Sequence, residues 1–271
     1  MFSLEIAGAD QPAVPPKVAM LDFDGTITVI REGWQTMLLT LFLELLRETP
    51  RGKQVSATEI EQAARRGIES NIGKKPIYQC FTLSELIRQF GGTPLSAEQY
   101  NEECERRLNK KVLPRMEYLH RGGDPAELMI PGTLPLLSML KRHRVKLYLV
   151  SGTEDDILKS DAKLLGITDY FDGGLFGSLP DPEAFSKAKI VSSILRDNPV
   201  RGEELLGIGD GRTETVDVKN VGGFTIGVAS DEEKRQGVDA WKREQLLRAG
   251  ADWIIPDYTD IEHIEQKLFP N

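Results

Sequence analysis

Residues 20–28 read MLDFDGTIT, a short apolar run that ends in two aspartates one residue apart, followed by Gly25 and Thr26. The run shows no alternation of apolar and polar residues, which is typical of a strand buried on both faces of a parallel sheet. Two carboxylates at the end of such a strand repel each other. We therefore expect a positive charge beside Asp22 and Asp24.

Further apolar runs follow in the second half of the chain, and segments with helical periodicity separate them. The runs are VKLYLV (145–150), ELLGIG (204–209), FTIGVA (224–229) and DWIIP (252–256), and the helical segments lie near 154–165, 185–196, 213–221 and 238–249. Strands that alternate with helices form parallel sheets. We predict an α/β fold with a Rossmann-like parallel sheet, helices on both of its faces, and 17–23 as its first strand. Residues 1–16 are expected to be a loose lead-in.

Residues 31–131 have a different pattern. Strand signals are nearly absent there, and four stretches have helical spacing of apolar residues: GWQTMLLTLFLELLRET, SATEIEQAARRGIES, KKPIYQCFTLSELIRQF and SAEQYNEECERRLNKKVLPRMEYLHR. Pro131-Gly132 marks the return to alternating strands and helices. The sequence therefore predicts two domains, an α/β core (1–30 and 132–271) and an all-α domain inserted at 31–131.

Composition excludes several classes of function. The 271 residues are 40% hydrophobic and carry a net charge of −8, without a run of Lys and Arg, so a nucleic-acid polymer is not an expected partner. No apolar stretch approaches the length of a membrane span, and the first residues lack a signal-peptide pattern. Cys80, Cys104 and three scattered histidines have no zinc-site spacing. We expect a cytoplasmic protein that binds no membrane; its oligomeric state is not set by the sequence.

Polar side chains follow three of the predicted strands. Asp22 and Asp24 follow the first, Ser151-Gly152 the second, and Asp210 a third, while Lys187 begins the helix before that third strand. The carboxyl ends of parallel strands share the edge where open α/β sheets bind ligands. We therefore expect these side chains to meet at one site.

Each of these features also has a purely structural explanation. Asp-Gly is common in turns, Ser151 to Glu154 fits a helix capping box, and a lysine at a helix start is usually a solvated charge. GIGDG (207–211) begins like a dinucleotide-binding loop, but Arg212 occupies the position of its last glycine. The occurrence of all of them at one edge of one sheet favours a joint site over separate turns and caps.

In order along the chain, these stretches resemble the haloacid dehalogenase-like (HAD) superfamily of phosphohydrolases. The four motifs are DFDGT (22–26), the strand ending in Ser151-Gly-Thr, Lys187 within FSKAKIVSSIL, and GIGDGRTE (207–214). The resemblance covers the α/β part of the chain. The helical insertion resembles the C1-type cap of the family only in its position and class.

The resemblance implies a phosphatase that acts on a small phosphorylated metabolite, an organic phosphate monoester, with Mg²⁺ as cofactor. Asp22 would be the nucleophile that forms an aspartyl-phosphate, and Asp24 the general acid and then the general base. The phosphate-binding residues would be Thr26, Ser151, Gly152 and Lys187.

The same resemblance implies a set of oxygen ligands for Mg²⁺. They would be the Asp22 and Asp210 carboxylates, the Asp24 backbone carbonyl, and Glu214, directly or through water. Glu214 stands where the family usually has aspartate, and Asp217 is its rival. Lys189 is the rival of Lys187 for the phosphate-binding lysine.

The helical insertion offers weaker candidates for substrate specificity. Arg31 lies at the start of the insertion, and Lys74 and Lys75 lie in a basic turn that an ordinary solvated loop would also explain.

Two functions other than a phosphatase stay open. A phosphomutase would keep Asp22 and Asp24, and a non-catalytic protein of this fold would bind a phosphorylated ligand without turnover.

Overall fold

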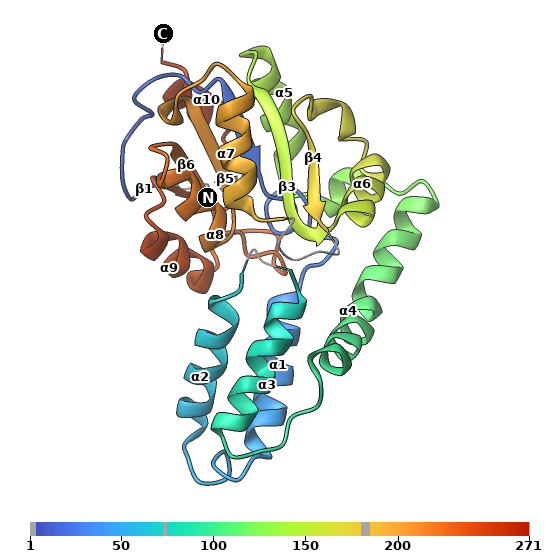
Figure 1. Cartoon of the computed structure of the whole chain (residues 1–271). Coiled ribbons are helices and arrows are strands. Elements are labelled where there is room, and N and C mark those ends of the chain that lie inside the picture. The colour runs from blue at the N-terminus through green and yellow to red at the C-terminus, as the bar shows by residue number, and fades with distance from the viewer. Residues whose placement is uncertain (1–3, 73–74, 180–184, 271) are drawn as a thin grey trace.

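The structure is a computed structural model that describes residues 4–72, 75–179 and 185–270. In the described part of the chain, seven strands form one sheet in the order β1-β7-β6-β5-β2-β3-β4 (Figure 1). All pairings from β2 to β7 are parallel, and β1 is antiparallel to β7. The strands are β1 Glu5–Ile6, β2 Val18–Leu21, β3 Lys146–Glu154, β4 Gly174–Ser178, β5 Leu205–Gly209, β6 Phe224–Val228 and β7 Trp253–Ile255. The predicted α/β fold with a largely parallel sheet is confirmed.

The sheet has two strands that the sequence did not predict. β1 lies within the expected lead-in and extends the edge of the sheet, where Glu5 accepts a hydrogen bond from Arg243 Nε at 2.6 Å. β4 contains Gly174 and Gly177, with only two apolar residues between strand-breaking glycines, so its pattern is weak. Both are edge strands, whose formation depends on an existing neighbour in the sheet more than on their own composition.

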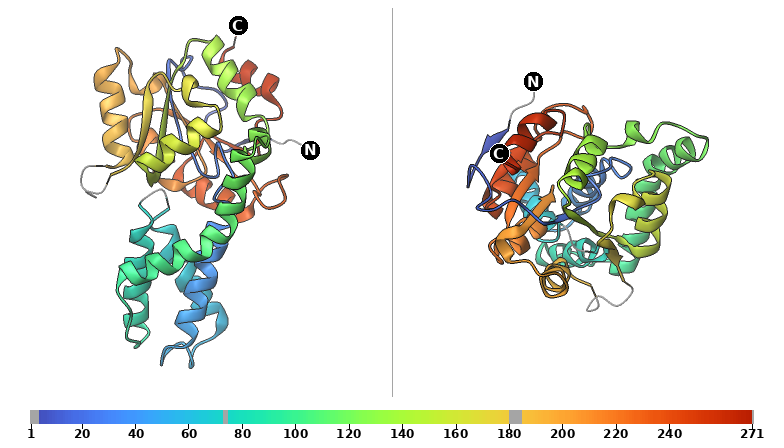
Figure 2. Two further views of the ribbon diagram at one scale, coloured as in Figure 1. Left: turned by 90° about the vertical axis from the view of Figure 1, so that its right-hand side faces the viewer. Right: turned by 90° about the horizontal axis from the view of Figure 1, so that it is seen from above.

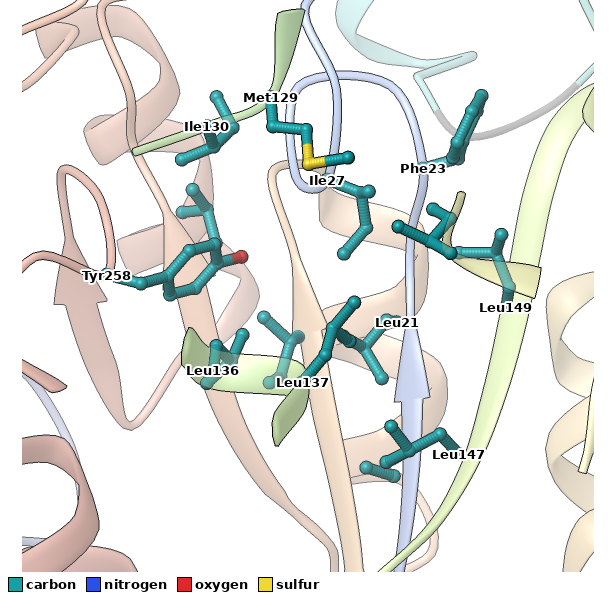
Figure 3. Packing of buried hydrophobic residues seen from close by; sticks show 14 of the residues in the cluster. Leu21, Phe23, Ile27, Met129, Ile130, Leu136, Leu137, Leu147, Leu149 and Tyr258 are labelled. Atoms are coloured by element: carbon teal, nitrogen blue, oxygen red, sulfur yellow. The ribbon is translucent and has the colours of Figure 1, made fainter. Parts of the chain in front are cut away.

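Helices cover both faces of the sheet, because alternate residues of β2 enter different hydrophobic clusters. Ala19 and Leu21 pack with α5 and α10 on one face, whereas Val18 and Met20 pack with α7 and α8 on the other. Figure 3 shows the first cluster, in which Leu21 lies among side chains of β3 and α5. The helices of this part are α5 Thr133–Arg142, α6 Asp155–Leu164, α7 Lys187–Asp197, α8 Arg212–Lys219, α9 Ala240–Ala249 and α10 Ile261–Leu268.

The longer elements between β2 and α5 are all helices, and these helices share a hydrophobic cluster of their own. The helices are α1 Trp34–Arg47, α2 Ala57–Glu69, α3 Ile77–Gln89 and α4 Ala97–His120. Ser56 and Ser96 cap α2 and α4, and Gln99 completes a capping box with Ser96. Figure 1 shows α1, α2 and α3 together below the sheet.

Helix α4 connects the two parts. Tyr100 and Cys104 in its first half pack in the cluster of the helical segment, whereas Val112 and Leu119 in its second half pack in the cluster beside the sheet. Figure 2 shows α4 rising from the lower helices along the side of the α/β part. The division of the chain at residues 31 and 131 stays a prediction, since α4 contributes to both clusters.

Among the helices of the described residues, none combines the length and the apolar character that crossing a bilayer requires.

Candidate active site

The carboxyl end of β2 is the centre of the site, because the order of the strands reverses around it. The chain proceeds from β2 to β3 and β4 on one side, and then places β5, β6 and β7 on the other. Leu21 pairs with Leu149 of β3 and with Ile208 of β5. Asp22 follows Leu21 directly, and Ser151 and Asp210 each follow a partner of Leu21 by two residues. The register therefore brings three of the four motifs to one edge of the sheet.

Lys187 places a positive charge beside Asp22, in addition to the metal ion that the resemblance implies. Its Nζ lies 2.9 Å from Asp22 Oδ1 and 2.9 Å from Glu214 Oε2, and its side chain is 1% exposed. Ser186 caps the start of α7, which fixes the direction in which the lysine leaves the helix. The two carboxylates raise the pKa of Lys187 more than burial lowers it, so the ammonium stays charged.

Asp22, Asp210 and Glu214 form a buried group of three carboxylates. One oxygen from each lies within 4.8 Å of the others. Burial, with the charges of Glu214 and Asp210 adding to it, raises the pKa of Asp22 to about 8 in spite of Lys187. Burial also raises the pKa of Asp210. Three buried carboxylates with hard oxygen atoms and no His or Cys suit a divalent cation such as Mg²⁺ or Mn²⁺.

Glu214 is held more firmly than the other two carboxylates. Its Oε1 accepts a hydrogen bond of 2.6 Å from the backbone N–H of Gly211, and its Oε2 contacts Lys187. Burial raises the pKa of Glu214, but Lys187 and the Gly211 N–H outweigh it, so the pKa lies below the ordinary value. The longer side chain of glutamate therefore reaches the group from the first turn of α8.

Asp24 is held by two donors. Thr153 Oγ1 donates a hydrogen bond of 2.7 Å to its Oδ2, and Arg31 Nη1 donates to its Oδ1 at 3.2 Å. Arg31 also reaches Asp161 Oδ2 of α6 through Nη2 at 2.7 Å. Arg31, predicted as a weak specificity residue, thus lies at the site and is engaged by two carboxylates.

The predicted phosphate-binding residues lie around the same edge. Thr26 is fully buried, its Oγ1 has no hydrogen-bond partner, and its carbonyl accepts a bond of 3.0 Å from Tyr258 Oη. Ser151 is buried and its Oγ accepts a bond from the backbone N–H of Thr153. Ser151 caps no helix, because α6 begins at Asp155 with Glu154 as its N-cap; Gly152 lies beside Ser151 at the end of β3.

The rival residues lie elsewhere. Lys189 is exposed on α7, and Asp217 is outside the group of three carboxylates among the described residues.

Lys75, predicted as a weak specificity residue, donates a hydrogen bond from its Nζ to the Leu179 carbonyl at 3.2 Å, between the helical segment and the α/β part. Lys74 lies outside the described residues.

Two functional candidates were missed in the sequence. Lys242 Nζ lies 2.7 Å from Asp210 Oδ2 and also contacts Glu232 Oε1. Lys242 comes from α9 and Glu232 from the loop after β6, within a stretch whose many charges resemble a solvated surface. The sequence held no signal for this contact, because it depends on how α9 packs against the sheet.

The helical segment contacts the edge of the sheet near these residues. Thr213 Oγ1 donates a hydrogen bond of 2.5 Å to the Ile72 carbonyl, and Trp241 Nε1 donates one of 2.6 Å to Glu69 Oε1. The ring of Trp241 also packs against the hydrophobic cluster of the helical segment. The end of α2 and Ile72 after it therefore contact the elements that carry Glu214 and Lys242.

A family model described as haloacid dehalogenase-like hydrolase matches residues 16–215, which include all four motifs. The chain belongs to the haloacid dehalogenase-like hydrolases. This confirms the predicted resemblance and the prediction of a hydrolytic enzyme. No curated protein matches the sequence significantly.

Solved structures similar to this HAD-like hydrolase include a predicted phosphoglycolate phosphatase from Haemophilus somnus, 16% identical, with a TM-score of 0.56 over 94% of this chain and 100% of that one. A predicted phosphatase from Clostridium acetobutylicum is 16% identical, with a TM-score of 0.55 over 95% and 100% of the two chains. A β-phosphoglucomutase from Clostridium difficile is 16% identical, with a TM-score of 0.56 over 93% and 97%. At this identity the likeness concerns the fold.

Proposed function

We propose that this HAD-like hydrolase is a Mg²⁺-dependent phosphatase that hydrolyses a small organic phosphate monoester through a phosphoryl group carried on Asp22. The observation that supports this most strongly is the position of Lys187 between Asp22 and Glu214, with Asp210 completing the group of carboxylates. A protein that only binds a phosphorylated ligand has no need of a nucleophile and a second acid, Asp24, at the same strand end.

Asp22, Asp210 and Glu214, with the carbonyl of Asp24, are the residues that would hold Mg²⁺. When bound, the ion supplies positive charge that offsets the repulsion between Asp22 and the substrate phosphate. Lys187 supplies a second positive charge beside Asp22. Both charges favour the ionised form of Asp22, whose pKa burial otherwise raises.

Asp22 attacks the phosphorus atom, and the bond from phosphorus to the leaving oxygen breaks. Asp24 gives its proton to that oxygen, and then removes a proton from the water that hydrolyses the aspartyl-phosphate. Thr153 and Arg31 orient Asp24 for both transfers. Ser151, Thr26, the backbone at Gly152 and Lys187 hold the phosphoryl oxygens as charge develops on them.

The helical segment would serve as the cap that excludes water from the leaving group. Ile72 is 7% exposed and its carbonyl is bound to Thr213, one residue before Glu214. The cap therefore closes on the helix that carries one of the carboxylates. Such a cap favours small phosphorylated metabolites over phosphorylated proteins as substrates.

The test is phosphate release from an aryl phosphate by the purified protein, with Mg²⁺ and with excess chelator. Turnover that depends on Mg²⁺ supports the proposal, and a panel of metabolite phosphates then identifies the substrate. Turnover of a sugar phosphate only when a bisphosphate is added would favour the phosphomutase alternative. A folded protein that binds Mg²⁺ and releases no phosphate from any of these substrates contradicts the proposal.

A further inference from the structure

Lys242 is a buried lysine that contacts the site from outside the four motifs. Its side chain is 4% exposed, and its Nζ lies 2.7 Å from Asp210 Oδ2 and contacts Glu232 Oε1. Asp239 caps α9 by accepting a bond of 2.8 Å from the Lys242 backbone N–H. The start of the helix therefore fixes where this lysine points.

The loop that carries Glu232 is itself anchored. Ser230 and Val238 form an antiparallel bridge, and Arg235 donates to the carbonyls of Glu127 at 2.7 Å and Met129 at 2.5 Å. The loop is thus tied to its own base and to the segment that precedes α5. Glu232 approaches Lys242 from a restrained position, so the ammonium is held on two sides.

Stability alone does not explain this arrangement. Burying a lysine and two carboxylates removes three charges from water, and well-packed apolar residues often stabilise a fold equally well in their place. Glu232 forms an ion pair with Lys242. Among the described contacts, Glu232 pairs with neither Asp22 nor Glu214. The pair of Lys242 and Glu232 instead gives one carboxylate oxygen of Asp210, Oδ2, a fixed ionic partner.

The backbone of Gly25 encloses that same oxygen. Gly25 has a φ of +77°, and a Cβ there would lie 2.2 Å from Asp210 Oδ2 and 2.9 Å from Lys242 Nζ. Only glycine fits between this turn and the pair. Oδ2 of Asp210 therefore lies between Gly25 and the Lys242 ammonium, which is its ion-pair partner at 2.7 Å, and no hydrogen bond of good geometry satisfies this buried oxygen among the described residues.

We propose that Lys242 is a positioning residue, which fixes the orientation of the Asp210 carboxylate toward the divalent cation through its contact with Oδ2, and that Glu232 holds Lys242 in this role. The inference rests on the proposed function, because it assigns Asp210 as a metal ligand. Partners of metal ligands typically contribute 10–100-fold to metal affinity by fixing the orientation of the ligand.

The test is the affinity of the substrate-free protein for Mg²⁺, measured by calorimetry. The variant E232Q/K242M removes one negative and one positive charge, so the net charge near the ion is unchanged while the contact to Asp210 is lost. We expect Mg²⁺ to bind about 10–100-fold more weakly. The variant E244Q/R248M removes an exposed ion pair from the same helix and should bind Mg²⁺ as the wild type does.

The gain in melting temperature on adding Mg²⁺ gives a second readout, because a ligand stabilises the folded state according to its affinity. A merely structural role for Lys242 would lower the melting temperature of the metal-free variant and leave the Mg²⁺ affinity unchanged, which would overturn the inference. Should E232Q/K242M fail to fold, E232Q/K242Q is measured with the same expectation. A wild-type protein that binds no Mg²⁺ would overturn the proposed function itself, whereas equal binding by wild type and variant overturns only the role of Lys242.

Discussion

Trp241 of α9 and Glu69 of α2 join the α/β part to the helical segment, with the indole Nε1 donating a hydrogen bond of 2.6 Å to Glu69 Oε1. Arg65 lies over the ring of Trp241, 5.1 Å from its centroid. Trp241 is the direct neighbour of Lys242 in the chain, so one turn of α9 contacts both the helical segment and a carboxylate of the site.

The hydrogen bond between Trp241 and Glu69 is expected to stabilise the contact between the helical segment and the α/β part. W241F keeps an aromatic ring but loses the donor, and E69A loses the acceptor. A double-mutant cycle on the free energy of unfolding should give a coupling of about 0.5–1.5 kcal/mol, and both single variants should raise the KM for substrate. Additive effects of the two substitutions would show that the two side chains do not interact in solution.

Much of the site could be predicted because its residues lie at the ends of strands. Asp22 and Asp210 directly follow β2 and β5, and Ser151 lies in the last part of β3, which extends to Glu154 and so runs past the predicted strand end at residue 150. A parallel register places these positions at one edge of the sheet. Lys187 could be predicted only through the resemblance to a family, since a lysine at a helix start does not by itself indicate a binding site. Its contact with two carboxylates depends on the packing of α7 against the sheet.

The parts that escaped prediction depend on contacts between distant segments. Lys242 reaches Asp210 only because α9 packs beside β6, and Asp161 meets Arg31 only because α6 lies beside the start of the helical segment. β4 was missed because its glycines weaken the strand pattern and its pairing with β3 compensates. The central strands could therefore be predicted from the local sequence pattern. The edge strands and the charged contacts around the site could not, because they depend on packing between segments that are distant in the sequence.

Asp24 should act in both steps of the reaction. With an aryl phosphate, its loss should slow the hydrolysis of the aspartyl-phosphate more than its formation. With an aryl phosphate, whose leaving group requires little protonation, D24N should still form the aspartyl-phosphate and then hydrolyse it slowly. We expect a burst of the aryl alcohol equal to the enzyme concentration, followed by turnover slower by about 10²–10⁴-fold.

T153V is the matched variant for Asp24, because it removes the hydroxyl that donates to Asp24 Oδ2 at 2.7 Å and leaves the acid in place. Loss of one hydrogen bond of about 1 kcal/mol should slow turnover about fivefold, without a burst. A D24N variant with normal steady-state turnover would remove Asp24 from the mechanism.

Arg31 should contribute to stability through Asp161. The side chain of Asp161 is 2% exposed, and R31M leaves this buried carboxylate without the cation that contacts it. We expect the free energy of unfolding, measured in urea, to fall by about 3–5 kcal/mol, with partial recovery in R31M/D161N. R121M, which breaks an exposed pair with Glu117, is the control and should change stability by less than about 1 kcal/mol. An R31M protein as stable as the control variant would show that the contact with Asp161 is not maintained in solution.

D22N should abolish turnover and leave the fold intact. Asparagine has the shape of aspartate but cannot form the aspartyl-phosphate, and Lys187 keeps Glu214 as a partner. Phosphate release should fall below detection with aryl phosphates as well as with the identified substrate, while the circular dichroism spectrum is unchanged. Normal turnover by D22N would exclude Asp22 as the nucleophile.

Mg²⁺ affinity should depend on pH through Asp22. Burial raises the pKa of Asp22 to about 8 in the metal-free protein, so below that pH the ion must displace a proton to bind. The affinity should therefore rise about tenfold for each pH unit between 6 and 8, or about 1.4 kcal/mol per unit, and level off above 8.

Burial also raises the pKa of Asp210, which acts in the same direction, so Mg²⁺ binding is favoured as the pH rises. Lys187 and Lys242 do not contribute, because their carboxylate partners raise both pKa values and the ammonium groups stay charged throughout this range. Calorimetry in buffers of different ionisation enthalpy measures the protons released on binding. D22N should bind Mg²⁺ more weakly and release fewer protons. Wild-type affinity that is constant from pH 6 to 8 would show that Asp22 is already ionised and that its burial is offset by the surrounding cations.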